Sequence, residues 1–141
     1  KKIDREYIQD LSNRALNDII QSNYDSAITK SRTILEEVFH YAIEKKGENP
    51  PTSGDIRQLY NQVKNLYNMH GNENIDRRIN TLLSGLEKIV TAITEMRNMN
   101  SDAHGIGSSR VKIHEHHARL FVNSAVAMTE FILSIANRSQ P

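Results

Sequence analysis

Apolar residues recur along the chain at helical spacing in five separate segments. In each segment they stand three or four positions apart, so they form one stripe on a helix of about 3.6 residues per turn. The predicted helices cover about residues 4–20, 25–46, 55–67, 75–103 and 114–137. No segment shows a strand-like alternation long enough to compete, and the chain has no internal repeat. The pattern predicts an all-α fold, a bundle of about five helices around one apolar core.

Gly, Pro and polar residues separate these helices. The stretch 47–54 (GENPPTSG) holds two prolines and two glycines, which are poorly tolerated inside a helix, so it predicts the clearest loop. Either Ser53 or Asp55 can cap the helix that follows. A polar connector at 70–74 and a loop at 105–112 separate the remaining helices. Such short connections favour an antiparallel arrangement of neighbouring helices.

The stripes also predict which residues form the core. Gly85 destabilises the fourth predicted helix by about 1 kcal/mol relative to Ala, so we expect another backbone to pass close to it. Tyr41, Tyr60 and Tyr67 are interpreted as core or core-edge residues rather than as platforms for base stacking. The fourth helix should bury Ile79, Leu82, Leu83, Leu86, Val90, Ile93 and Met96, and the last should bury Leu120, Phe121, Ser124, Ala125, Met128, Phe131, Ile132 and Ile135.

Length and composition limit the class of protein. A chain of 141 residues is typical of one domain, and the absence of Cys excludes a disulfide framework and a thiolate metal site. No uninterrupted apolar run approaches the roughly 20 residues that span a bilayer, and the charged first residues do not form a signal peptide. We therefore expect a cytoplasmic protein with no membrane partner. Because the chain starts at Lys1 rather than Met, we expect it to be part of a longer polypeptide.

The net charge is close to zero. Eighteen basic and 17 acidic residues give +1 at pH 7 with His neutral. A protein that binds nucleic acid mainly through charge should be more basic than this. Any contact with nucleic acid must therefore be local.

One stretch, 97–107 (RNMNSDAHGIG), carries more hydrogen-bonding side chains than the end of an apolar helix needs. Arg97 and His104 stand seven residues apart, which is about 700° on an unbroken helix, so the two positions share a face within roughly 20°. Their Cα atoms would then lie about 10.5 Å apart along the axis, a gap that an Arg side chain can largely cover. The two side chains can therefore converge on one phosphate.

An Arg and a His at one phosphate suit the cleavage of RNA. His104 can take a proton from a hydroxyl and give one to a leaving oxygen. Arg97 can hold two non-bridging phosphate oxygens and stabilise the charge that builds in the transition state. The chemistry that fits is attack of a ribose 2′-OH on the adjacent phosphodiester, with no metal ion and no cofactor.

Less specific interpretations stand beside this one. An Arg and a His seven residues apart on a helix are usually surface residues with no joint role. The three His of 114–117 (HEHH) resemble a metal site, but two of them point about 100° apart and one Glu is the only nearby carboxylate, so a solvated helix start is the better interpretation. Glu36, Glu37 and His40 form either surface pairs worth a few tenths of a kcal/mol or the lining of a cleft.

The stretch 97–107, together with residues 116–133 (HHARLFVNSAVAMTEFIL), resembles the end of the abortive-infection C-terminal (Abi-C) domain. That domain belongs to the HEPN superfamily, named for higher-eukaryote and prokaryote nucleotide binding, whose signature is an Arg, a polar residue after it, and a His a few residues on. Arg97, Asn98 and His104 match this signature. Residues 24–43 (YDSAITKSRTILEEVFHYAI) are similar to the second helix of the same domain.

The resemblance implies an α-helical homodimer with a cleft at its axis, where Arg and His from both chains cleave RNA without a metal ion. Arg97 and His104 would be the catalytic residues, and Asn98, Ser101 and Asp102 would orient His104 or bind substrate. We expect the twofold interface to use the second and fourth helices and the loop after the fourth. Such domains serve in phage defence or in toxin–antitoxin systems, commonly at the C-terminus of a longer protein.

We therefore interpret residues 1–141 as one HEPN/Abi-C-like domain, expected to be the C-terminal part of a longer protein that acts as an endoribonuclease. The expected partners are RNA, a second copy of the chain, and an upstream domain or cognate protein, but not DNA. One alternative is a non-catalytic dimerisation or sensing module that regulates an associated effector. Another is an antitoxin or partner-binding bundle. The presence of both Arg97 and His104 favours the nuclease, because a module that only binds would not need both.

Overall fold

The computed structural model describes residues 3–52, 55–69, 76–101 and 113–138, and leaves the side chains of 96–101 outside that description. Within these ranges the chain forms helices and no strand: α1 Arg5–Ile20, α2 Tyr24–Lys45, α3 Ile56–Leu66, α4 Arg77–Ser101 and α5 Glu115–Ala136. Residues 75 and 103, the predicted ends of the fourth helix, lie outside the described residues. The other predicted boundaries differ from the observed ones by at most one residue. The predicted all-α bundle is confirmed.

Local sequence signals explain where the helices begin and end. The carboxylate of Asp4 accepts a hydrogen bond of 2.9 Å from the backbone N–H of Tyr7 and so caps α1. Asp55 caps α3 in the same way, at 2.9 Å from the N–H of Gln58. After α2 the backbone turns at Gly47 with φ of 78°, a left-handed conformation that glycine adopts without strain.

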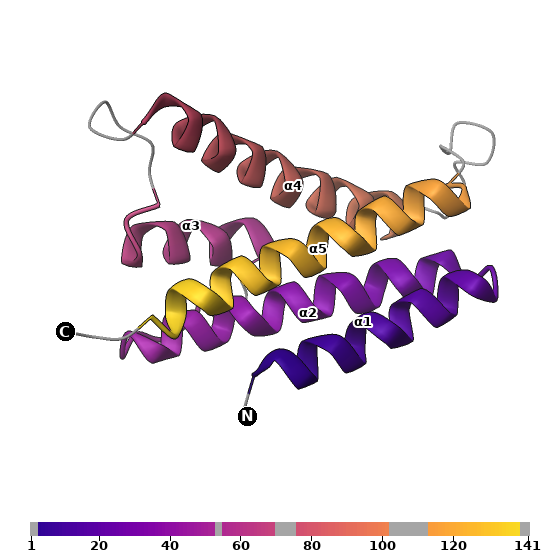
Figure 1. The fold of residues 1–141 in the computed structure, drawn as a ribbon, viewed down its shortest axis with the longest axis horizontal. Helices are drawn as coiled ribbons and strands as arrows, with labels where there is room; N and C mark the ends of the chain where they lie inside the picture. Colours follow the sequence, from indigo (N-terminus) through magenta and orange to yellow (C-terminus); the bar gives the residue numbers. More distant parts are fainter. Residues whose placement is uncertain (1–2, 53–54, 70–75, 102–112, 139–141) are drawn as a thin grey trace.

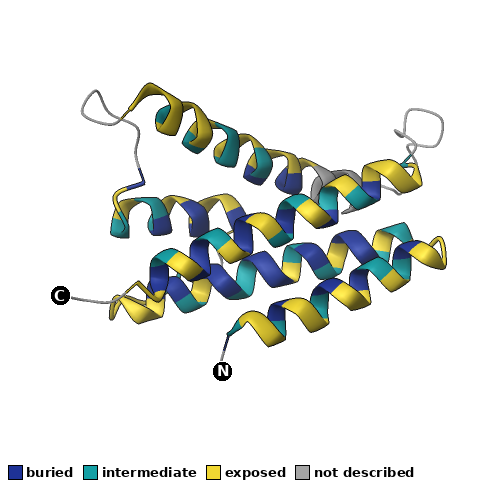
Figure 2. Ribbon diagram, in the orientation of Figure 1, coloured by how far each residue is buried: buried dark blue, intermediate teal, exposed yellow. Residues whose placement is uncertain are grey.

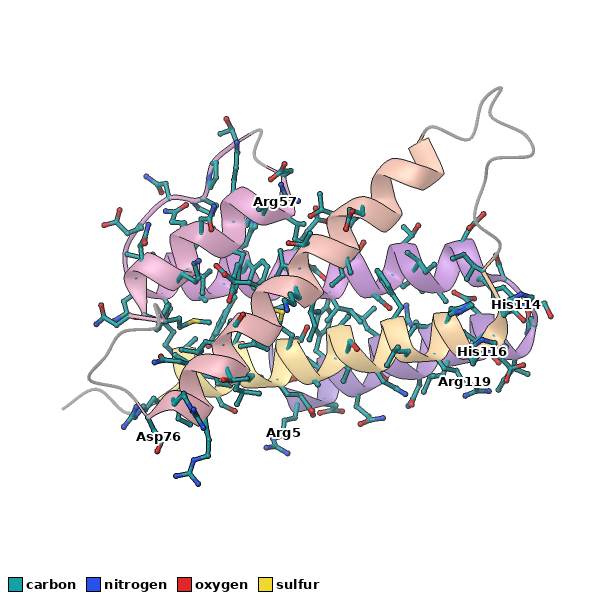
Figure 3. The ribbon with its side chains drawn as sticks, turned by 90° about the horizontal axis from the view of Figure 1, so that it is seen from above. Arg5, Arg57, Asp76, His114, His116 and Arg119 are labelled. Atoms are coloured by element: carbon teal, nitrogen blue, oxygen red, sulfur yellow. The ribbon has the colours of Figure 1, made fainter. Side chains whose placement is uncertain are left out.

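The helices pack in two groups (Figure 1). α1, α2 and α5 lie side by side, and α2 makes its most extensive contacts with α5. α3 and α4 cover the other flank of α2, and α4 runs at an angle across α5 (Figures 1 and 3). Fully buried large side chains fill the space between them: Tyr60, Phe39, Ile8, Ile19, Ile28, Ile34, Leu35, Ile43, Ile56, Ile93, Met128 and Ile132.

The core prediction is wrong for the outer part of two apolar stripes. On α4 the buried apolar residues are Val90 and Ile93, whereas Ile79 is 47% exposed and Leu82 is 61% exposed. On α5, Leu120 is 68% exposed. On α4 the reason is geometric: Leu82 and Ile79 stand within about 20° of the buried Ile93 and Val90 around the axis but lie in the first half of the helix, so the stripe extends further along α4 than the part that the chain itself covers.

The expectation for Gly85 is also wrong within this chain. A Cβ atom built at Gly85 would meet nothing within 4 Å. No described backbone therefore requires a glycine there, and the residue lies on the open side of α4.

The three tyrosines occupy the predicted positions. Tyr60 is 2% exposed and packs against Phe39 with ring centroids 5.8 Å apart. Tyr41 and Tyr67 are partly buried at the edge of the core. The Tyr67 hydroxyl donates a hydrogen bond of 2.7 Å to the carbonyl of Ala42, which ties the end of α3 to α2.

α5 is the one helix among the described residues that is long and apolar enough to cross a membrane, with a mean hydropathy of 1.3 over its best window. It instead lies against α1, α2 and α4, with Val122, Met128 and Ile132 buried. Its composition is therefore accounted for by its place in the core of the bundle.

Candidate functional site

The structure places part of the predicted catalytic stretch. Arg97, Asn98 and Ser101 lie on the last turns of α4, which ends at Ser101. Asp102 and His104 lie outside the described residues. The convergence of Arg97 and His104 on one phosphate therefore stays a prediction.

The register of α4 sets position 97 in an unusual place for a charged residue. It follows Ile93 by four residues and Val90 by seven, so it stands within about 40° of both around the helix axis. Ile93 is 2% exposed and Val90 is 1% exposed. Position 97 thus continues the face of α4 that packs on the bundle.

Several polar residues share the end of the molecule toward which α4 runs (Figure 1). α5 begins there, and α1 turns into α2 at the same end. His114, His116 and Arg119 gather at the start of α5 (Figure 3). Glu115 forms an ion pair of 3.0 Å with Arg119, one turn further on.

The three His of 114–117 form a cluster of exposed rings at the start of α5. The ring centroids of His114 lie 5.6 Å from those of both His116 and His117, and His116 and His117 are 4.2 Å apart. Within the described part of the chain, no group of three or more His, Asp or Glu side chains is arranged to hold a metal ion. His114 is the N-cap of α5, so the predicted solvated helix start is confirmed.

Apolar residues also stay exposed along α4 and α5, from the start of α4 to the start of α5. We call this area the α4–α5 surface and define it by Ile79, Leu82, Ile89, Leu120 and Phe131, all exposed or partly buried. Both helices are exposed along this part of their length in Figure 2.

The flanking helices leave one side of α4 and one side of α5 uncovered. α3 is tied to one flank of α4 through an ion pair between Lys64 and Glu87, and Leu82 stands about 140° round α4 from Glu87. α1 covers the flank of α5 that carries Val122, and Leu120 stands about 160° from it. Leu82 and Leu120 therefore lie away from the flanks that α3 and α1 cover.

A cavity lies beside α2. Its lining includes three residues for which the sequence allowed two interpretations, surface pairs or the lining of a cleft. Glu36, Glu37 and His40 line a cavity of about 400 Å³, together with Ile3, Tyr41 and Glu44. Glu37 accepts a hydrogen bond from the hydroxyl of Tyr7 on α1. The i, i+4, i+8 spacing of Glu36, His40 and Glu44 is the sequence signal that would have added Glu44 to this set. Three carboxylates repel phosphate, so this cavity does not suit an RNA backbone.

One family model matches the chain. It is Abi_C, described as an HEPN-like domain, and it matches residues 6–136, which include α1 to α5 almost completely. The matched range contains both Arg97 and His104. No curated protein and no solved structure matches the chain. Because the match extends over nearly the whole sequence, this chain belongs to the Abi_C family of HEPN-like domains.

Proposed function

We propose that this domain is a metal-independent endoribonuclease, part of a cytoplasmic phage-defence or toxin–antitoxin protein. The observation that carries the proposal is the spacing of Arg97 and His104, with six residues between them, inside the range that matches the Abi_C family. The register of α4 supports it, because position 97 stands on the same side of the helix as Val90 and Ile93, where an apolar residue would continue the stripe.

The proposed reaction needs one proton acceptor and one proton donor. A neutral imidazole of His104 removes the proton of the ribose 2′-OH, and the oxygen forms a bond to the adjacent phosphorus. The bond from phosphorus to the 5′-oxygen breaks, and an imidazolium gives that oxygen a proton. Arg97 holds the non-bridging oxygens throughout and stabilises the added negative charge. Asn98, Ser101 and Asp102 orient His104 or bind the substrate.

A second copy of the chain supplies the second imidazole in this proposal, because the motif of each chain contains one His. The α4–α5 surface is the face that suits such a dimer. It is apolar, it is open in the single chain, and α4 leads from it directly to Arg97. One face of α2, which was expected to contribute, carries Glu36, Glu37 and Glu44, whose burial would be costly. We therefore assign the interface to α4 and α5 in place of α2 and α4.

A non-catalytic dimerisation or sensing module is the second candidate. Two observations favour it: the net charge of +1 and the acidic cavity on α2, neither of which attracts RNA. Such a module would use the same α4–α5 surface and would not depend on His104.

Incubation of total RNA with the purified domain separates the two candidates. The wild type should fragment RNA, and His104→Ala should reduce the rate by at least about 10²-fold. His40→Ala is the matched control, since His40 lies on the acidic face of α2, and it should cleave like the wild type. Intact RNA with a dimeric, folded wild type would support the non-catalytic module.

A further inference from the structure

The start of α5 is held by an imidazole. The backbone N–H of His114, the N-cap residue, donates a hydrogen bond of 3.1 Å to Nδ1 of His117. The N–H of His117 in turn donates to the carbonyl of His114, at 3.1 Å. The first bond is the half of a capping box in which the third helical residue, ordinarily Glu or Gln, reaches back to the N–H of the N-cap residue. The second is an ordinary backbone bond of the first turn.

An imidazole in this role works only in one protonation state. To accept the N–H of His114, Nδ1 of His117 must keep its lone pair, so the neutral ring carries its proton on Nε2. Protonation of Nδ1 turns the acceptor into a donor, and two N–H groups then face each other. A Glu at the same position keeps its acceptor oxygens down to about pH 4, whereas imidazole ordinarily titrates between about pH 5 and 8.

Two further imidazole rings lie beside this cap. His116 and His114 lie beside His117, with centroid distances of 4.2 and 5.6 Å, so protonation of the cluster brings like charges together. The first turn of a helix also has a positive field.

Two ion pairs lie near this end of the molecule. Glu115 is paired with Arg119 at 3.0 Å on α5 itself. On the helices packed against this end, Asp18 of α1 is paired with Lys30 of α2 at 2.5 Å. The contact of α5 with α1 and α2 here is apolar, between Ala118 and a cluster that includes Ala15 and Ala27.

We propose that His114, His116 and His117 form a proton-sensitive cap that holds the first turn of α5 at neutral pH and releases it in mild acid. His114 stands ten residues after His104 in the sequence (114 − 104 = 10). The first turn of α5 anchors the chain after the catalytic stretch, so this anchor depends on the protonation of the cap. This regulatory consequence rests on the proposed nuclease function. The cap itself does not.

Nuclear magnetic resonance of the full chain tests the cap without any measurement of cleavage. At about pH 8 the ring of His117 should carry its proton on Nε2, with Nδ1 as an acceptor. On lowering the pH to about 5, the protection of the 114–118 amides against hydrogen exchange, corrected for the intrinsic rate, should fall about tenfold. His117→Glu should keep this protection at both pH values, and His117→Ala should lack it at both.

Two results would overturn the proposal. One is a His117 ring protonated on Nδ1 at about pH 8. The other is wild-type protection at about pH 5 equal to that of His117→Glu. Neither result bears on whether the domain cleaves RNA, so failure of the cap and failure of the nuclease are separate outcomes.

Discussion

Nζ of Lys30 on α2 lies 2.5 Å from Oδ2 of Asp18 on α1, across the turn that joins the two helices. The hydroxyl of Ser26 donates to the same carboxylate oxygen at 2.8 Å. The hydrogen bond from Lys30 is the main reason that the pKa of Asp18 falls below its ordinary value of 3.8, and Ser26 adds to the effect. The side chain of Asp18 is only 15% exposed, so water screens this interaction less than it would on an open surface.

The first prediction concerns the acid stability that this carboxylate provides. Because its pKa is lower in the folded state, Asp18 stabilises the fold above its unfolded pKa, and the contribution is lost as the pH falls through the folded value. Asp18→Asn should lower the free energy of unfolding by about 1 kcal/mol at neutral pH. In urea titrations the difference from the wild type should shrink as the pH drops below about 4.

The control for this prediction is Asp10→Asn. Asp10 pairs with Arg14 at 3.1 Å on α1, but its side chain is 57% exposed, so its loss should change stability by less than about 0.5 kcal/mol. Equal effects of the two substitutions at every pH would show that the Asp18–Lys30 pair has no special role.

The second prediction concerns a buried hydroxyl. The Tyr60 side chain is buried and its hydroxyl has no hydrogen-bond partner among the described residues. Burial raises the pKa of Tyr60 to about 12, and the carboxylate of Glu87 adds to the effect. Tyr60→Phe should therefore be as stable as the wild type at neutral pH, or more stable by up to about 1 kcal/mol.

Alkaline pH gives the sharper comparison for Tyr60. Because the pKa of Tyr60 is higher in the folded state, the neutral hydroxyl stabilises the fold fully below the unfolded pKa of about 10. This contribution is lost as the pH rises through the folded pKa of about 12. Denaturant unfolding should show the wild type losing more stability than Tyr60→Phe between these values. A Phe variant that is clearly less stable at neutral pH would mean that the hydroxyl has a partner.

The third prediction distinguishes residues that stabilise the core from residues of the proposed catalytic site. Phe39→Ala removes a ring that is 0% exposed at the contact between α2 and α3, so it should cost about 3–5 kcal/mol. Arg97→Ala and His104→Ala should leave the melting temperature within a few degrees, because their proposed role is at a cleft. Thermal unfolding followed by circular dichroism measures both. Loss of the fold in His104→Ala would make His104 a structural residue.

The sequence predicted the helices well because most of their signals are local. Asp4 and Asp55 act as caps within three residues of their targets, and Gly47 stands where α2 ends. Periodicity alone does not say how much of an apolar stripe the same chain covers. Leu82 fits its stripe as well as the buried Ile93 does, yet it stays exposed because it lies in the first half of α4, which diverges from α5.

The site was harder to predict, since it depends on contacts between segments that are distant in sequence. Glu36, Glu37 and His40 alone do not indicate a cavity, which needs Ile3 before α1 to close it. The cap on α5 was also missed. Its signal was a His three residues after another His, in the place of the usual Glu.

The fourth prediction concerns the α4–α5 surface. Leu82→Glu and Leu120→Glu should each weaken self-association at least tenfold, because each buries a charge in an apolar contact. Ile20→Glu is the matched control: Ile20 is 71% exposed but lies at the end of α1, outside this surface, and its loss should leave the dimer intact. Light scattering that gave a wild-type mass near the 16.1 kDa of one chain would contradict the proposed dimer.

The chemical identity of the RNA ends tests the central proposal most directly. Cleavage by the 2′-OH, with Arg97 and His104 as the only catalytic groups, should leave a 2′,3′-cyclic phosphate and a 5′-hydroxyl. It should continue in excess chelator, and a single 2′-deoxy sugar at the cleaved position should block it. The His104→Ala variant should form none of these products. Fragments with 5′-phosphate and 3′-hydroxyl ends, or complete loss of cleavage with chelator, would mean that a metal-activated water is the nucleophile and would contradict the roles given to Arg97 and His104.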